Sequence, residues 1–359
     1  MNISRKCHRD MMRRPRYIVR NQCGILALVL ALSLGLSWGK GYARPLFEIK
    51  LATLAPENSS LMKIFRQMDG ELRRQTEDRL GFKIFSGFSL GGERDIFRKM
   101  RIGLIHAATF TSTALATVNP TVRVLQIPFL FDNYREVDYI LEKEGPELRR
   151  GFREKGYEVL GWTEVGFIYI MTTVPIASVE DLKGKKVWTR ANSPLANAVF
   201  RKARVSPVAI GAPDVLVALQ TNLLQVVYNS PYYALITQWY SRIKYLTDLP
   251  LTYIGGALIM NSKTFSRLSA ADQKILREVC ARYTRLLTEK TREDNSEALR
   301  VILRHGVKKI SPEPAEIARF KDLLNQAVRD LGSKYMPQAT FERVREELQA
   351  FRSGEKKAP

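Results

Sequence analysis

The sequence predicts an α/β fold large enough for two domains. The chain has 359 residues, and 45% of them are apolar, which is typical of a globular protein of this size. Strand-like and helix-like segments alternate to give two β-α-β-α-β units, a pattern that favours parallel sheets with right-handed crossovers. From Ser269 onward the pattern is helical throughout.

The first unit begins with an alternating apolar segment that predicts a strand. Its expected segments are a strand at 47–53, a helix at 61–80, a strand at 82–85, a helix at 93–103 and a strand at 105–110. Glycines at 91 and 92 predict a turn before the second helix. Pro128 interrupts the next apolar segment, 124–131, and favours a packed loop there. A helix is expected at 134–155.

The second unit follows two further strand-like segments. The expected segments are strands at 157–163, 167–173 and 187–189, a helix at 194–203, a strand at 208–210, a helix at 213–223 and a strand at 225–228. A helix at 232–245 and a strand-like segment at 251–260, broken by Gly255 and Gly256, come next. Helices at 269–305, 314–331 and 340–351 complete the prediction, with a flexible tail at 353–359.

The first 43 residues have the three parts of a secretory signal peptide. Residues 1–22 are rich in Arg, residues 24–38 are almost entirely apolar, and small residues stand at Gly41 and Ala43. We expect cleavage after Ala43 and a periplasmic protein. The apolar core has 15 residues, which is short for a membrane span of about 20. An uncleaved membrane anchor is the alternative, and Met1, Met11 and Met12 are possible starts.

The net charge of the chain is +21, of which residues 1–43 contribute +7. The rest stays basic, but its Lys and Arg are spread among Asp and Glu and form no nucleic-acid motif. We therefore expect no nucleic-acid partner. The three cysteines (Cys7, Cys23 and Cys280) and three histidines (His8, His106 and His305) lack metal-site spacing, so no metal or other cofactor is expected.

The segment 183–194 has the features of a ligand-binding loop. A short strand ends here and a helix begins, with Ser193 as the expected N-cap and Pro194 in the first turn. Ligands of open α/β sheets bind where strand ends meet helix starts. Trp188 and Arg190 are two apart on this strand, so they point to the same side. The loop could present a cation and an aromatic wall, or Arg190 could be solvated while Trp188 packs beneath it.

Six segments together resemble the extracytoplasmic solute receptors of TRAP transporters, the DctP type. They are Ile49-Lys-Leu-Ala-Thr-Leu-Ala-Pro56, Leu90-Gly-Gly-Glu-Arg-Asp-Ile-Phe-Arg-Lys-Met100, Ile127-Pro-Phe-Leu-Phe131, Asp181-Leu-Lys-Gly-Lys-Lys-Val187, Val217-Ala-Leu-Gln-Thr221 and Leu268-Ser-Ala-Ala-Asp-Gln-Lys274. They follow the family's order over about residues 46–300. The resemblance implies a two-domain, type II-like periplasmic-binding-protein fold with crossing strands, a long helix and a ligand cleft that closes on binding. It also implies delivery of the solute to a membrane permease.

Two positions depart from the pattern of the acid-binding members. Trp188 stands where the family's ligand-binding Arg is expected, and Arg190 lies two residues later. Ser230, rather than Asn, precedes Pro231, and Asn229 comes one residue earlier. The main hypothesis is a receptor for a small organic acid held by Arg190. The alternative is an apolar or amphipathic ligand, in systems that use an additional helical-repeat partner protein.

The expected ligand-binding residues lie at strand ends, at helix starts and on the crossing strands. They are Arg190, Trp188, Asn192, Tyr228, Asn229, Ser230, Tyr232, Tyr233, Thr53, Leu54, Thr109, Phe110, Phe167 and Gly256. A secreted hydrolase is a remote alternative, because no nucleophile motif appears. We expect no catalytic residues and no enzymatic activity.

The resemblance also sets the expected domain boundaries. Domain I would comprise residues 44–167 and 254–305, and domain II residues 168–253. The helices within 306–352 would pack across both domains.

Overall fold

The computed structural model describes residues 46–190 and 193–355. The predicted signal peptide and Asn192 lie outside these ranges. The unit that begins at Pro45 is organised around a ten-stranded sheet with the main order β2-β1-β3-β9-β4-β7-β5-β6. A mixed α/β fold with a central sheet is therefore confirmed.

The first part of the sheet contains the first predicted unit. β1 (Phe47–Ala52) pairs in parallel with β2 (Leu80–Phe85) and with β3 (Ala107–Thr111). β9 (Thr252–Asn261) runs antiparallel to β3 and to β4 (Tyr157–Thr172). The predicted parallel β-α-β-α-β arrangement is confirmed for this part.

The second part of the sheet contains the second predicted unit. It begins at the C-terminal end of β4, where Tyr169–Thr172 pair with β7. β5 (Val187–Thr189) pairs in parallel with β6 (Pro207–Ala209) and β7 (Val226–Asn229). β7 is antiparallel to β4, and β8 (Tyr245–Thr247) pairs with both β4 and β10 (Lys308–Ile310). Both β8 and β10 correct the prediction, which placed Tyr245 in a helix and treated everything after Ser269 as helical.

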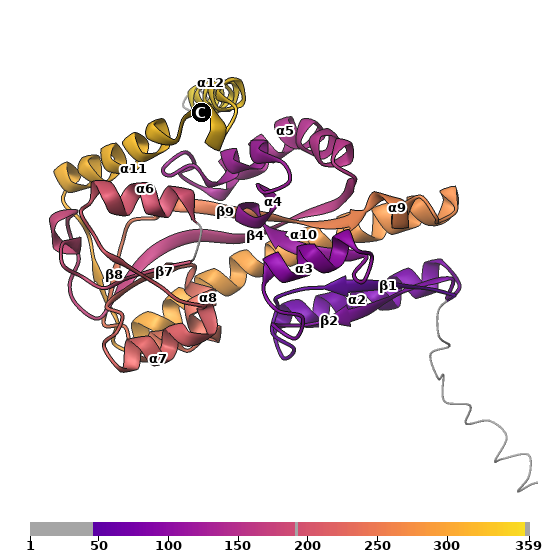
Figure 1. Cartoon of the computed structure of the whole chain (residues 1–359), viewed down its shortest axis with the longest axis horizontal. Coiled ribbons are helices and arrows are strands. Elements are labelled where there is room, and N and C mark those ends of the chain that lie inside the picture. Colours follow the sequence, from indigo (N-terminus) through magenta and orange to yellow (C-terminus); the bar gives the residue numbers. More distant parts are fainter. Residues whose placement is uncertain (1–45, 191–192, 356–359) are drawn as a thin grey trace, which may run out of the picture. The chain divides into compact units, whose positions relative to one another are not determined.

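β4 is one strand of 16 residues, although two separate strands were expected. Its pairing with β9 shifts register between Val159 and Gly161 and again between Glu164 and Gly166. Each bulge takes up a residue and turns the strand without ending its hydrogen bonds. β4 can therefore pair with β9 in the first part and with β7 and β8 in the second (Figure 1).

Helices cover both parts of the sheet. The longer ones are α2 (Ser60–Gln75), α3 (Glu93–Arg101), α5 (Tyr134–Glu154), α6 (Pro194–Lys202), α7 (Val215–Gln220), α8 (Pro231–Ile236), α10 (Ala270–Arg304), α11 (Pro314–Tyr335) and α12 (Gln338–Glu355). Short helical turns include α4 (Ser112–Leu115), α9 (Ser262–Phe265), η1 (Pro120–Gln126), η2 (Glu180–Leu182), η3 (Ala212–Asp214) and η4 (Trp239–Ser241).

Two helices, α2 and α8, end five or more residues before their predicted ends at 80 and 245. α2 ends before residue 80 because Glu77 and Asp78 adopt left-handed φ values of 48° and 58°. The Thr76 hydroxyl accepts a hydrogen bond from the Leu80 N–H at 3.1 Å and fixes this turn. α8 ends near Thr237 because Gln238 has a φ of 60°, which an α-helix cannot contain.

α10 joins the hydrophobic cores of the two parts of the sheet. Ser269 caps it by accepting a hydrogen bond from the Asp272 N–H at 3.1 Å, as the sequence predicts. The helix has 35 residues and is therefore about 52 Å long. Leu276 and Leu287 pack in the core with β1 and α2, whereas Ile302 packs in the core around Trp188. Figure 1 shows α10 running from beside α2 to beside α8.

The C-terminal helices contact both parts of the sheet through different partners. Phe320 of α11 is buried in the same core as Phe200 of α6. Glu144 and Glu136 of α5 pair with two arginines of α12. Between these contacts Gly332 has the non-helical angles φ 59° and ψ −163° and kinks the segment.

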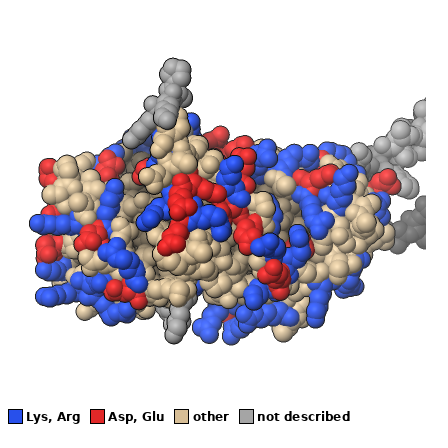
Figure 2. All heavy atoms as spheres, turned by 90° about the horizontal axis from the view of Figure 1, so that it is seen from above, with Lys and Arg blue, Asp and Glu red and all other residues tan. Residues whose placement is uncertain are grey.

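The surface carries charges of both signs. Figure 2 shows Lys and Arg interspersed with Asp and Glu over the face seen from above. Within residues 46–190 and 193–355, no helix is long and apolar enough to cross a membrane.

Gly161 provides a test of the contact between β4 and α10. A Cβ atom there would lie 2.0 Å from the Thr284 hydroxyl oxygen, whereas one at Gly70 in α2 would meet nothing within 4 Å. Gly161→Ala should reduce the free energy of unfolding by about 1–3 kcal/mol, because overpacking forces the backbone to shift. Gly70→Ala, the control, should raise it by about 0.5–1 kcal/mol through helix propensity. Urea denaturation measures both, and equal effects would contradict the close packing.

Candidate functional site

Hydroxyl and carboxylate groups gather where β1 and β3 end. The Thr109 hydroxyl donates a hydrogen bond to the Thr53 hydroxyl across the two parallel strands at 2.9 Å. Thr111 is two residues further along β3 than Thr109, so both side chains point to one face. This face carries the hydroxyl groups of Thr53, Thr109 and Thr111, and Thr111 is hydrogen-bonded to the carboxylate of Glu93.

Glu93 is the first residue of α3, and two bonds to Thr111 fix its carboxylate. The Thr111 N–H donates to Oε1 at 2.6 Å, and the Thr111 hydroxyl donates to Oε2 at 3.1 Å. Glu93 is partly exposed, but surrounding protein atoms raise the pKa of its carboxyl group, and Arg190 opposes that rise. Each oxygen keeps one further lone-pair direction for a donor.

Arg190 follows β5 and brings a positive charge to the same place from the second part of the sheet. Its guanidinium lies 5.6 Å from the centre of the Trp188 ring, and Arg190 is exposed. No carboxylate of the described residues lies within 4.0 Å of it. It interacts electrostatically with Glu93, Tyr228 and Tyr233. A cation and a carboxylate from different parts of the sheet therefore lie near each other.

Trp188 lies in the core beneath Arg190 and is 1% exposed. Its indole N–H donates to the Ile210 carbonyl at 3.1 Å, and its ring packs against Tyr228 at 5.5 Å and Trp239 at 5.3 Å. The expected same-side placement of Trp188 and Arg190 fits the cation–π contact. Of the two expectations for this loop, the buried ring agrees with Trp188 packing beneath a solvated Arg190, and a direct contact of the ring with a ligand stays a prediction.

The polar groups after β7 are used within the chain. Asn229, 6% exposed, accepts a hydrogen bond from the Ser230 N–H at 2.9 Å. Ser230, 1% exposed, caps α8 by accepting from the Tyr233 N–H at 3.3 Å. Both residues are therefore buried and bonded within the chain, and their predicted contacts with a ligand stay a prediction.

The three tyrosines of this segment have different surroundings. Burial raises the pKa of Tyr228 and of Tyr233, and the charge of Arg190 opposes the shift in both, which places both near Arg190. Tyr232 instead turns toward α2, with its hydroxyl 3.4 Å from that of Ser60. Its hydroxyl thus reaches the start of another helix, and its predicted contact with a ligand stays a prediction.

Three further predicted residues, Phe110, Phe167 and Gly256, are packed in the interior of the protein. Phe110 is 3% exposed and stacks on Phe97 with ring centres 3.8 Å apart, so it belongs to the core. Phe167 is buried against Tyr134 and Tyr253. A Cβ at Gly256 would lie 2.6 Å from the Phe110 carbonyl oxygen, so this glycine permits close strand packing.

Two predicted residues remain. Leu54 is partly exposed after β1 and packs against the core of the first part. Asn192 lies outside the described residues, so its predicted role stays a prediction.

The structure brings Arg190, Tyr228 and Tyr233 together with Glu93, and places Thr53 beside Thr109. Sequence reasoning missed Glu93. Its segment offers only a partial signal, because Glu93 follows two glycines and begins the helix after β2, whereas its partners Thr111 and Arg190 lie in other segments. Among the described residues, no group of three or more His, Cys, Asp or Glu side chains is arranged to hold a metal ion.

This architecture is that of α/β proteins in which two sets of strand ends are joined by shared strands, an arrangement that suits the binding of a small solute. The chain belongs to the bacterial extracellular solute-binding protein family 7, the DctP family, whose model matches residues 51–334. It is thus a solute-binding protein of the type that serves TRAP transporters.

Two curated relatives align over most of the chain. A solute-binding protein of Verminephrobacter eiseniae is 27% identical over 279 residues, which covers 77% of this chain and 82% of the relative. The 2,3-diketo-L-gulonate-binding periplasmic protein YiaO of Escherichia coli is 26% identical over 272 residues, covering 74% of this chain and 81% of that protein.

Solved structures share the two-domain fold at low identity. The sugar acid binding protein DctPAm of Advenella mimigardefordensis, in complex with galactonate, has a TM-score of 0.78 at 21% identity and covers 86% of this chain and 99% of that chain. A TRAP periplasmic solute-binding protein of Haemophilus influenzae with bound L-gulonate has a TM-score of 0.77 at 19% identity, covering 84% and 99%.

The raised pKa of Glu93 predicts a pH-dependent stability difference. The folded protein holds this proton more tightly than the unfolded chain, so ionised Glu93 destabilises the fold as the pH rises through its folded pKa. Gln can keep both contacts with Thr111 without the charge. Glu93→Gln should therefore unfold at a higher temperature than wild type at pH 8, and the difference should shrink toward pH 4. Calorimetry across this range measures it, and a constant difference would contradict burial of the charge as the cause.

Proposed function

We propose that this protein is the periplasmic receptor of a TRAP secondary transporter and captures a small organic acid, a sugar acid, for delivery to a membrane permease. The observation that carries the proposal is that Arg190 follows β5 while Thr111 holds the carboxylate of Glu93 at the start of α3, so that the two charges interact from different parts of the sheet. One ligand placed between them would contact both parts of the sheet. Its carboxylate would bind the guanidinium, and its hydroxyl groups would donate to Glu93.

The chemistry of sugar acids matches these groups. Such a ligand has one carboxylate and several hydroxyls, each able to donate and accept. Arginine offers a planar pair of donors to a carboxylate. Thr109, which is partly exposed, would serve a further hydroxyl, and Thr53, which is 3% exposed, would hold the Thr109 side chain through their hydrogen bond. The ligands named for the Advenella, Haemophilus and Escherichia proteins described above are sugar acids.

An apolar ligand has less support. That alternative rested on Trp188, on the tyrosines after β7 and on the displaced family arginine, and of these the Trp188 ring is 1% exposed with its N–H bonded to Ile210. A partly buried carboxylate at Glu93 would also remain unpaired against an apolar ligand, which is costly. We propose a binding role without catalysis, since the family consists of solute-binding proteins.

We further propose that the domain boundaries follow the sequence prediction. Domain I would hold residues 44–167 and 254–305, and domain II residues 168–253. The hydrophobic clusters support this division, because Met171, Trp188 and Trp239 share one core while Ile49, Leu51 and Phe65 share another.

Replacing Arg190 tests the carboxylate contact. Arg190→Ala should weaken the binding of galactonate or L-gulonate by about 10- to 150-fold, because hydrogen bonds to charged groups contribute about 1.5–3 kcal/mol. Arg190→Lys should recover part of the loss through charge alone. Isothermal titration calorimetry with a panel of sugar acids, neutral sugars and fatty acids measures these affinities.

Arg267 supplies a matched control, since its guanidinium also lies over an aromatic ring, 5.4 Å from the centre of Phe47. Arg267→Ala should leave the affinity unchanged. If Arg190→Ala binds a sugar acid as tightly as wild type does, Arg190 has no carboxylate role. If only fatty acids bind the wild-type protein, the sugar-acid proposal is wrong.

The proposed export route also has a direct test. Cleavage after Ala43 gives a mature chain that begins at Arg44. Protein expressed from the full sequence and isolated from the periplasm should show this N-terminus by mass spectrometry. An intact leader in the membrane fraction would instead indicate an anchored protein.

A further inference from the structure

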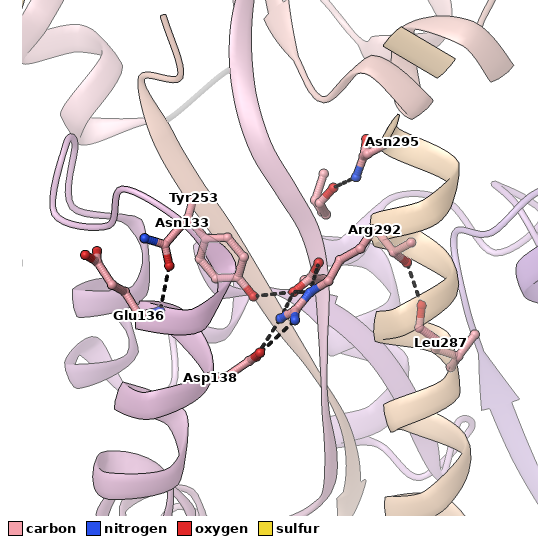
Figure 3. Close-up of polar contacts among 10 residues, drawn as sticks. Asn133, Glu136, Asp138, Tyr253, Leu287, Arg292 and Asn295 are labelled. Carbon is pink, nitrogen blue, oxygen red and sulfur yellow. Dashed lines mark hydrogen bonds and ion pairs between the residues drawn. The ribbon is translucent and has the colours of Figure 1, made fainter. Parts of the chain in front are cut away.

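Two residues of α10 hold β4 at the point where it passes between the two parts of the sheet (Figure 3). The passage lies at the bulge between Glu164 and Gly166. Arg292 and Asn295 are three residues apart on the helix and therefore share one face. Arg292 binds the side chain of Glu164, and Asn295 binds the backbone carbonyl of Val165, the extra residue at the centre of the bulge.

Arg292 forms a charged cluster around Glu164. Its Nε donates to both Glu164 oxygens at 3.1 and 3.2 Å, and its Nη2 donates to Oε2 at 3.0 Å. The Tyr253 hydroxyl donates to the same Oε2 at 3.0 Å. The other side of the guanidinium binds Asp138 of α5 at 2.7 and 2.6 Å. One arginine thus links α10, β4 and α5.

Glu164 depends on this cluster because its side chain is 1% exposed. Burial raises the pKa of its carboxyl group, and Arg292 opposes that rise. Removing Arg292 alone would leave the buried Glu164 carboxylate without the cation that pairs with it, and breaking a buried ion pair in this way is strongly destabilising. The strand is therefore held to the helix at this position by a contact that is costly to break.

Asn295 uses both ends of its amide. Its Nδ2 donates to the Val165 carbonyl at 2.9 Å, and its Oδ1 accepts from the Tyr232 N–H at 3.0 Å. Gly166 has a φ of 99°, and a Cβ there would lie 2.7 Å from Asn295 Nδ2. Residue 166, which follows the bulge centre, must therefore be glycine for α10 to pack this close to β4. A single buried side chain connects the bulge to the first turn of α8.

The neighbouring residue, Asp294, connects α10 to the start of α2. The Ser60 hydroxyl donates to its Oδ2 at 2.5 Å, and the Tyr232 hydroxyl lies 3.4 Å from the same Ser60 oxygen. α2 follows β1 and Thr53, whereas α8 follows β7 and Asn229. The first turns of α2 and α8, which follow the two sets of strand ends, are thus both bonded to one turn of α10.

We propose that Arg292 and Asn295 are positioning residues for ligand binding, which set the angle between the two sets of strand ends so that Arg190 and Glu93 meet one ligand. The inference rests on the proposed function for its ligand but assigns a role to residues that form no hydrogen bond or ion pair with Arg190 or Glu93. Weakening these contacts should lower the affinity by letting the ligand-free protein sample a wider range of angles.

The first test removes the charged pair as a unit. The double variant Glu164→Gln/Arg292→Met leaves no uncompensated buried charge, and the amide oxygen of the introduced glutamine can still accept from Tyr253. Its affinity for galactonate or L-gulonate should fall about 3- to 30-fold, the range found for mutations that alter coupling between sites. The matched control is Glu144→Gln/Arg343→Met. That pair also buries a glutamate, 4% exposed, with bonds of 2.6 and 2.5 Å, but it joins α5 to α12.

Equal affinity losses in the two double variants would overturn the proposal, since a general stability effect explains them. The second test is Asn295→Ala, which removes both amide contacts without altering charge. It should weaken binding to a similar extent, and unchanged affinity would remove Asn295 from the role.

A measurement without ligand separates this inference from the proposed function. Spin labels at cysteines replacing the exposed residues Lys63 in α2 and Gln220 in α7 report the distance between the two parts. The distance distribution should broaden in both α10 variants and stay as in wild type for the Glu144/Arg343 control. If wild type binds no sugar acid, the proposed function fails while this result still decides the positioning role. Unchanged distributions in folded variants would overturn it.

Discussion

A single strand, β4, carries backbone hydrogen bonds for both parts of the sheet, and the rest of the molecule depends on how it passes between them. β4 departs from a regular strand at two bulges, and a bulge bends the strand and increases its local twist. The bulge around Gly166 provides the turn, and its left-handed φ of 99° requires glycine. Because β9 follows β4 through this region, and α10 packs behind it, the two sets of strand ends inherit their geometry from this crossing.

Much of this fold could be predicted because its signals are local. The alternating segment of β1, the Ser269 cap and the apolar positions along α10 each lie within a few residues of the element they specify. β8 and β10 are three-residue strands that pair Tyr245 with Lys308, far apart in the chain, so neither carries a local signal. The end of α2 was missed for a different reason, because left-handed Glu77 and Asp78 are not glycines.

The site was predictable only where one segment determines it. Arg190 follows from a strand that ends before Ser193 and Pro194, which mark a helix start. Glu93 could not be assigned from its segment alone, since its role depends on Thr111 and Arg190, which folding brings to it. The burial of Trp188 depends in the same way on Trp239, a residue in a segment with no strand signal. Contacts between distant segments decide which polar strand-end residues face a ligand.

The kink at Gly332 has a mechanical consequence. α11 is fastened to α6 in one part of the molecule, and Arg352 of α12 is paired with Glu136 of α5 in the other, so the C-terminal segment is a second link beside the crossing strands. Two rigid bodies that are joined at two separate points keep one rotational freedom, about the line through those points. Gly332, with no side chain to obstruct its backbone angles, is suited to be the second pivot. The tail of the chain would then act as a linkage that restricts any opening to a single axis.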